Sequence, residues 1–289
     1  MDFFAQIIIN GILLGAIYAL ISIGLNLIFG VIKIVNFAHG EFLMIGMYLT
    51  FLLFSQSGID PYLSIPIVFV LLFVLGILIH KIILQPLLGK AEFNILLTTA
   101  GLGIVFQNLA LMFFKSDYRV IQTSYSAAKI ELFGTLVSVS RLGAFIVAIL
   151  AAVILYFVLM KTRIGMDIRA VSQDPEAAVL MGINDKKIFT ITFGLGVGLV
   201  GIAAAIITPI YYIFPTVGES FSTISFIVVV LGGLGSFHGA LIGGFIIGIV
   251  EAIGGIISSA EWARVFSLLI FLFILFVRPS GIMGKNARV

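Results

Sequence analysis

Polar residues that could do chemistry occur at three places in an otherwise apolar chain of 289 residues. Two strings each contain a His-Gly pair beside helix-breaking residues, and a lone carboxylate, Glu251, lies within an apolar run. Irregular backbone at membrane depth is tolerated only where it is buried in protein or lines a wet cavity, and transporters use such breaks to handle substrate. The chemistry that these residue types predict is noncovalent recognition of a polar solute on a path through a membrane.

The two His-Gly strings read NFAHGE from residue 36 and GGLGSFHG from residue 232. Their similar make-up predicts an internal pseudo-repeat. The alternative is that both strings form interfacial turns, with an amphipathic histidine at headgroup level. The predicted substrate path comprises Asn36, His39, Gly40, Glu41, Gly232, Gly233, Gly235, Ser236, His238 and Glu251.

Glu251 carries the strongest single argument for a polar path. A charged side chain at the bilayer centre costs about 2.5–3.5 kcal/mol on insertion scales unless it is protonated, paired or hydrated. It therefore lines the path, pairs with another helix, or lies close enough to the surface to reach water. For Gln107 and Asn108 we predict hydrogen bonds between helices.

Composition indicates that membrane-spanning helices must position these residues. The chain is 61% hydrophobic and 10% charged, whereas soluble domains are about 45–50% apolar. We predict an all-α integral membrane protein, a polytopic bundle of about eight transmembrane helices with discontinuous segments, forming one domain over residues 1–289. The predicted spans are 3–32, 37–54, 62–83, 93–114, 142–160, 188–213, 240–257 and 262–277, with a segment at 221–231 that is too short to cross.

The polar run 161–187, called the hub below, interrupts these spans and contains a complete short-helix signal. An aspartate can cap the first amides, a proline suits the first helical position, and a glycine suits a left-handed stop. The helix dipole stabilises the negative charge of a glutamate in the first turn, and two alanines have a high propensity for helix. The residues of this signal are Asp174, Pro175, Glu176, Ala177, Ala178 and Gly182. A second local signal, alternating polarity at 129–132 and 137–140, predicts a small hairpin outside the membrane.

Basic residues predict the orientation, because cytoplasmic loops carry an excess of lysine and arginine. With the hub in the cytoplasm, the inner side holds Lys33, Lys81, Lys90, Lys161, Arg163, Arg169, Lys186, Lys187, Arg278, Lys285 and Arg288. The outer side then holds Lys115, Arg119, Lys129, Arg141 and Arg264. This distribution predicts an outside N-terminus and a cytoplasmic C-terminus.

Other classes of function find no support in the residues. The chain has no phosphate-binding loop for ATP, no paired-histidine metal motif and no nucleophile with its base at neighbouring positions, so we expect neither an enzyme nor a metal or cofactor site. The string GVGLVG from residue 196 matches a dinucleotide-binding pattern, but no strand surrounds it. Small residues there, and the glycines from 239 to 248, instead predict close helix packing. The net charge of +3 is spread over short loops, which argues against nucleic-acid binding.

Two resemblances sharpen these predictions. The stretch from Glu176 to Gly182 resembles the EAA loop of ABC-importer permeases, which docks on the ATPase subunit, although the second half of the family pattern is missing. Together with the two His-Gly strings, it is similar to the LivH family, the permease subunits of bacterial branched-chain amino-acid ABC importers. The resemblance covers nearly the whole chain.

The resemblance implies a permease subunit of an ATP-driven importer in the bacterial inner membrane. Its implied partners are a second homologous permease subunit, two cytoplasmic ATP-binding subunits, and a periplasmic binding protein that delivers branched-chain amino acids. ATP would drive alternating access through the hub helix. Two alternatives stay open: a related permease for urea, short amides or other small polar solutes, and a proton-coupled secondary transporter using Glu251 or Glu41.

Overall fold

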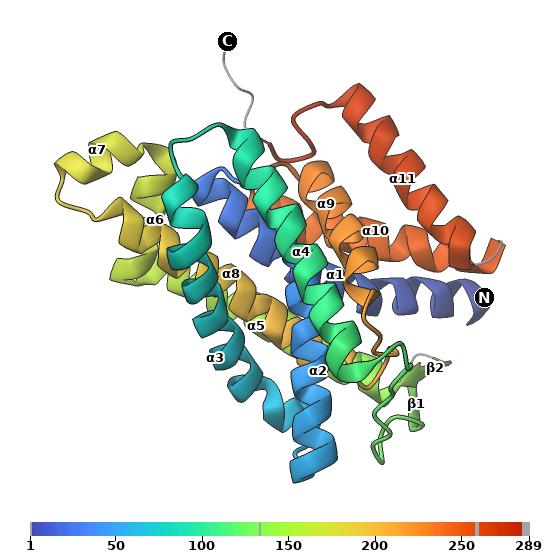
Figure 1. Cartoon of the computed structure of the whole chain (residues 1–289). Helices are drawn as coiled ribbons and strands as arrows, with labels where there is room; N and C mark the ends of the chain where they lie inside the picture. Colours follow the sequence, from blue (N-terminus) through green and yellow to red (C-terminus); the bar gives the residue numbers. More distant parts are fainter. Residues whose placement is uncertain (1, 133, 258–259, 285–289) are drawn as a thin grey trace.

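The computed structural model describes residues 2–132, 134–257 and 260–284 and is almost entirely helical (Figure 1). Lys285 and Arg288, assigned above to the inner side, lie outside the described residues. Within the described ranges, six helices are long and apolar enough to cross a membrane. They are α1 (Asp2–Ile32), α3 (Pro61–Ile79), α4 (Glu92–Phe114), α5 (Val139–Lys161), α8 (Asp185–Ile207) and α10 (Phe237–Ile257). Shorter apolar helices are α9 (Val217–Gly232) and the part of α11 (Ala260–Val277) from Val265 onward. Helix α2 (His39–Ser57) has 19 residues and belongs to neither group. The predicted all-α membrane bundle is confirmed.

The helices form a buried centre and an outer ring. In α1 and α8, 78% of the most apolar window is buried inside the protein, against 22% in α4 and 28% in α3. The first half of α2 is also buried, including Phe42, Met44 and Met47. Since lipid offers no hydrophobic drive for one helix to bury another, such centres are held by close packing.

Small residues let the central helices approach closely, as the glycine spacing predicted. A side-chain carbon added to Gly15 of α1 would lie 2.8 Å from the Cα of Phe245 on α10. Gly248 faces the backbone of the same stretch of α1. On the other side, an added carbon at Gly198 of α8 would lie 2.8 Å from the ring of Phe69 on α3.

The predicted hairpin marks one side of the molecule, called the hairpin side. Strand β1 (Lys129–Leu132) pairs antiparallel with β2 (Thr135–Ser138), so the second strand begins two residues before its predicted start. The loop before the hairpin is tied to the start of α3, because the hydroxyl of Tyr125 donates to Oδ2 of Asp60 at 2.8 Å. Burial, together with this hydrogen bond, raises the pKa of Tyr125 above its usual range.

The hub marks the opposite side, called the hub side (Figure 1). The predicted short helix is α7 (Pro175–Leu180), capped at its start by Asp174 and stopped by Gly182 in the left-handed region with φ 87°. The sequence reading missed the preceding helix, α6 (Arg163–Gln173). Its apolar positions are spaced as on one helical face, and Ile168 and Val171 are buried on that face.

Two predicted span limits are corrected. The helix predicted to reach residue 213 ends at Ile207, because Pro209 has no N–H to continue it, and Ile213 instead forms an antiparallel bridge with Arg119. The short segment near 221–231 is longer than predicted: α9 has 16 residues, about 24 Å at 1.5 Å per residue. It is still shorter than a bilayer core of about 30 Å, which agrees with the predicted short segment.

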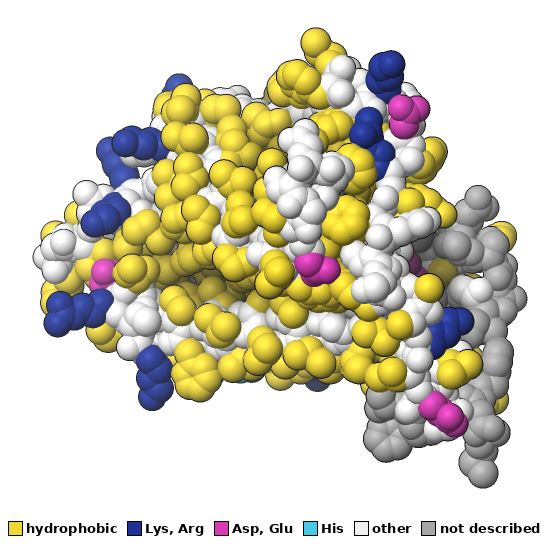
Figure 2. Space-filling view, turned by 90° about the horizontal axis from the view of Figure 1, so that it is seen from below, with side chains coloured by type: hydrophobic (Ala, Val, Ile, Leu, Met, Phe, Trp, Pro, Cys, Tyr) yellow, Lys and Arg dark blue, Asp and Glu magenta, His cyan; other side chains and the backbone are white. Residues whose placement is uncertain are grey.

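The surface matches a membrane environment. On the face shown in Figure 2, hydrophobic side chains cover the middle, and lysine and arginine side chains lie toward the edges. Such a belt keeps the basic side chains out of hydrocarbon while apolar atoms face lipid.

Candidate functional site

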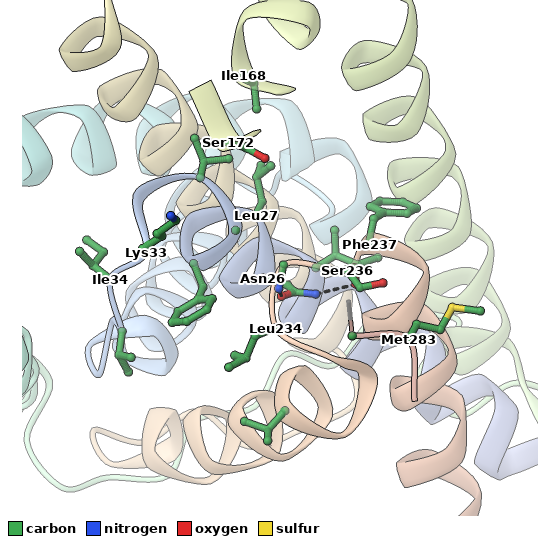
Figure 3. A pocket seen from close by; sticks show the side chains of 18 of the residues that line it. Asn26, Leu27, Lys33, Ile34, Ile168, Ser172, Leu234, Ser236, Phe237 and Met283 are labelled. Atoms are coloured by element: carbon green, nitrogen blue, oxygen red, sulfur yellow. Dashed lines mark hydrogen bonds between the residues drawn. The ribbon is translucent and has the colours of Figure 1, made fainter. Parts of the chain in front are cut away.

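A cavity of about 1350 Å³, called the hub-side cavity, opens beside the hub (Figure 3). Residues from the end of α1, the starts of α4 and α10, the end of α5 and one face of α6 line it. Most of these side chains are apolar. The polar ones are Asn26, Lys33, Glu92, Arg169, Ser172, Gln173, Ser236, His238 and Ser280.

Asn26 holds the wall of this cavity in place. Its amide nitrogen donates to the carbonyl oxygen of Ser236 at 2.6 Å, and its amide oxygen accepts from the backbone N–H of Gly235 at 2.6 Å. The side chain is only 3% exposed. Because both ends of the amide are used on the turn between α9 and α10, Asn26 fixes the break in the membrane-spanning structure from a neighbouring helix. This contact joins residues more than 200 positions apart in the chain.

The turn between α9 and α10 needs its glycines. Gly233 and Gly235 have φ values of 105° and 80°, in the region that favours glycine. The segment after α11 adds backbone bonds to the same place, because the N–H of Met283 donates to the carbonyl of Gly232 at 3.0 Å. Gly232 and Gly233 therefore shape the break, whereas Gly235, Ser236 and His238 line the cavity.

Helix α6 joins the cavity to the exposed end of the hub. Ile168, Arg169 and Ser172 on α6 line the cavity, and only the capping residue Asp174 separates α6 from α7. On α7, Ala178 is buried, whereas Leu180 and the adjacent Met181 are 88% and 83% exposed. These two exposed apolar side chains were not singled out from the sequence, where the charged and alanine residues of the motif drew attention.

The first His-Gly string enters the interior of the bundle. His39 opens α2 and is fully buried, with Nε2 3.0 Å from the carbonyl oxygen of Ile21. Since a carbonyl only accepts, Nε2 donates. Ile21 lies 11 residues before the end of α1, about 16 Å along its axis, so α2 begins near half depth. Asn36, also fully buried, accepts from the N–H of Ala38 at 3.1 Å and so shapes the start of α2.

Next to His39, a second polar feature lies nearer the hairpin side and is called the carboxylate cluster: Glu41, Gln107 and Glu219. The amide nitrogen of Gln107 lies 3.0 Å from Oε1 of Glu41 and 3.0 Å from Oε1 of Glu219. Thus three helices, α2, α4 and α9, meet at one amide. The prediction that Gln107 bonds between helices is confirmed, but Asn108 bonds the carbonyl of Ile104 within its own helix.

Glycines bring α2 and α9 together at the cluster. The N–H of Gly40 donates to Oγ of Ser222 at 2.8 Å, and a side chain on Gly40 would overlap the carbonyl oxygen of Gly218. Glu41 is 3% exposed, and its Oε2 has no hydrogen-bond partner among the described residues. Glu219 was not singled out from the sequence, because it lies beyond the short segment predicted there.

Glu251 lies apart from both features. It is partly buried on α10, beside Tyr18 of α1 and Tyr211. The structure therefore distributes the predicted path residues over the hub-side cavity, the buried start of α2, the carboxylate cluster and this separate tyrosine environment.

Comparison with known proteins finds relatives that match nearly the whole chain. Residues 7–275 match the family model described as branched-chain amino acid transport system / permease component. The chain is 31% identical to the high-affinity branched-chain amino acid transport system permease protein LivH of Escherichia coli K12, over 98% of this chain and 96% of that protein. It is 30% identical to the corresponding protein BraD of Pseudomonas aeruginosa, with the same coverage. A ribose import permease of Bacillus subtilis is 28% identical over 86% of this chain and 74% of its own length. No solved structure gives a significant match.

Proposed function

Because the chain belongs to the branched-chain amino acid transport system permease family, we propose that it is the membrane-spanning subunit of an ATP-driven importer of branched-chain amino acids. Binding-protein delivery, ATP hydrolysis in two partner subunits and pairing with a second permease are parts of this proposal. So is a location in the inner membrane, with the hub and the C-terminus in the cytoplasm and the N-terminus outside.

The observation that carries the proposal is the double role of α6. One face of this helix lines the hub-side cavity at Ile168 and Ser172, and its C-terminal end leads directly into α7. A force applied to the exposed end of α7 therefore reaches the wall of the cavity through about one helix length. This is the contiguous rigid connection that coupling between two sites requires.

In this mechanism, α7 is the docking element. Its apolar tip, Leu180 and Met181, inserts into an ATPase subunit, and Asp174 with Gly182 keeps the helix short and rigid. When the ATPases close, α6 moves against α1 and α8 and changes the opening of the hub-side cavity. The free energy comes from the partners, since this chain has no ATP-binding loop.

The proposed path runs between the carboxylate cluster and the hub-side cavity. Helix α9 presents Glu219, Thr223, Phe226 and Val230 at spacings of four, three and four residues, which places them on one face. Val230 lines the cavity at one end, and Glu219 belongs to the cluster at the other. Between them the ring of Phe226 lies 5.1 Å from that of Phe37, so two aromatic rings stand midway along the path. A largely apolar path with polar groups at each end suits an amphipathic amino acid.

The test replaces the exposed apolar tip of α7. We expect Leu180→Asp with Met181→Asp to abolish co-purification of the ATPase subunits and ATP-driven leucine uptake in proteoliposomes, because losing two buried apolar anchors removes about 3 kcal/mol or more. The matched control is Lys90→Glu, which adds negative charge in the loop before α4 without touching α7.

Normal folding is checked by a single peak in size-exclusion chromatography. A tip variant that still binds ATPases and transports contradicts the docking role of α7. A wild-type protein that purifies alone and transports when driven by a proton gradient contradicts the importer function, and Glu41 and Glu251 then become the residues to test.

A further inference from the structure

The carboxylate cluster is an unusual arrangement for helices facing lipid. It places two carboxylates around one neutral amide, at distances of 3.0 Å to each. In the part of the chain that the structure describes, no lysine, arginine or histidine side chain pairs with either carboxylate. Ionised carboxylates at this depth cost several kcal/mol unless a positive group compensates them.

The N-terminal ends of two helices partly stabilise the charge of these carboxylates. Glu41 lies in the first turn of α2 and Glu219 in the first turn of α9, where the amide dipoles favour a negative charge. The dipoles supply only partial charge, and Oε2 of Glu41 remains buried with no hydrogen-bond partner among the described residues. A buried acceptor of this kind is normally satisfied, and a donor carried by a ligand would satisfy it.

The open side of the cluster leads onto the proposed path. Glu219 and Thr223 of α9 are exposed, and so is Asn108 of α4. Polar side chains within membrane-spanning helices rarely face lipid, since they line a watery passage or another subunit. A donor can therefore reach Glu219 from the side where the solute would travel, and the buried Glu41 lies directly behind it, joined through Gln107.

We propose that Glu41 and Glu219 form the subsite that binds the ammonium group of the transported amino acid, with Gln107 holding the two carboxylates at the right separation. This inference deepens the proposed function, because it assigns the part of the substrate that this permease recognises. A primary ammonium has three N–H donors and one positive charge, which suits two carboxylates with unused acceptor positions. A divalent metal ion suits the cluster less well, since the described residues contain no group of three or more metal-ligating His, Cys, Asp or Glu side chains.

The experiment separates the ammonium from the rest of the substrate. The intact importer in lipid nanodiscs, without binding protein, is titrated with three probes and followed by ligand-detected NMR. L-leucine carries both charged groups, isopentylammonium lacks the carboxylate, and 4-methylpentanoate lacks the ammonium. The proteins compared are wild type, Glu219→Gln, Glu41→Gln and the control Glu131→Gln, which removes an exposed carboxylate from the hairpin. Empty nanodiscs measure binding of each probe to lipid.

We expect L-leucine and isopentylammonium, but not 4-methylpentanoate, to bind wild type and the Glu131 control. Each variant of the cluster should weaken the binding of both probes by about tenfold, which corresponds to about 1.4 kcal/mol, because one charge-assisted hydrogen bond is lost. Glu219→Gln keeps the shape of an exposed side chain, so its folding is safe even if Glu41→Gln fails to fold. Equal binding of 4-methylpentanoate, or unchanged binding by Glu219→Gln, overturns the subsite. Absence of binding by all three probes also overturns the subsite. A proton shared between the two carboxylates is then the remaining explanation of the cluster.

Uptake measured on the same preparations separates this inference from the proposed function. If wild type binds isopentylammonium through Glu219 but does not take up leucine when supplied with ATP and binding protein, the importer function fails and the ammonium subsite stands. If wild type takes up leucine while Glu219→Gln transports and binds as well as wild type, the subsite alone fails.

Discussion

The hub-side cavity and the carboxylate cluster both lie where a helix begins inside the bundle, but they treat their polar groups in opposite ways. At the cavity, the amide of Asn26 is bonded at both its nitrogen and its oxygen. At the cluster, one carboxylate oxygen of Glu41 is buried without a partner in the described chain. Satisfied buried groups stabilise a fold, whereas an unsatisfied one is retained at a cost that a ligand can remove. In the mechanism that we propose, the first feature therefore holds the path open and the second recognises what passes.

The largest expected effect comes from Gly40, which sets the distance between α2 and α9 at the cluster. In Gly40→Ala, the added carbon overlaps the carbonyl oxygen of Gly218, which is backbone and cannot rotate away. We expect a loss of about 3 kcal/mol in the free energy of unfolding, the upper range for overpacking, together with loss of leucine uptake. Denaturant titration in detergent and uptake in proteoliposomes measure the two effects.

The matched control for Gly40 is Gly101→Ala on α4, where an added carbon meets nothing within 4 Å. This change should preserve uptake and stabilise the helix by up to about 1 kcal/mol, because alanine favours helix over glycine. If Gly40→Ala is as stable and active as Gly101→Ala, close approach of α2 and α9 does not define the cluster.

The second-largest expected effect concerns Asn26, which holds the turn at the hub-side cavity. Asn26→Leu leaves the N–H of Gly235 and the carbonyl of Ser236 without their side-chain partner. We expect a loss of about 2 kcal/mol in stability, since two hydrogen bonds are lost and each contributes about 1 kcal/mol. Thermal unfolding followed by chromatography measures the loss.

Asn108→Leu is the control for Asn26, because the amide of Asn108 bonds only the carbonyl of Ile104 in its own turn and is exposed. The Asn26 variant should also keep its affinity for isopentylammonium, since the cluster is untouched. A variant that unfolds no earlier than the Asn108 control would show that the turn between α9 and α10 holds without Asn26.

The two features also differ in how far the sequence could predict them. The turn at the cavity was predicted because its glycines and serine are adjacent in the chain, and local backbone requirements appear in local sequence. The same holds for α7, whose cap at Asp174 and stop at Gly182 are eight residues apart. The cluster could be predicted only in part: Glu41 and Gln107 were noticed singly, whereas Glu219 was not.

What the sequence could not supply was the meeting of distant helices. Gln107 bonds Glu219 across 112 residues and Glu41 across 66, and neither pairing follows from periodicity. Helix α6 was missed for a different reason. Its polar face made residues 163–173 look like a loop, although Ile168 and Val171 lie on one buried face.

The smallest expected effects come from two serines, each of which accepts a hydrogen bond from the backbone N–H of a glycine. Ser222 accepts from the N–H of Gly40 at 2.8 Å, across from α9 to α2, and Ser236 accepts from the N–H of Gly239 at 3.1 Å within its own helix start. Replacing either by alanine should cost about 1 kcal/mol, the usual value for a lost cap or hydrogen bond. The consequences for function should differ. At the cavity Asn26 still holds the turn, so Ser236→Ala should leave uptake within about twofold of wild type. Ser222→Ala loosens the residue next to Glu41 and should weaken isopentylammonium binding by about threefold to tenfold. Equal effects of the two variants on probe binding would mean that the cluster does not depend on the contact between α2 and α9.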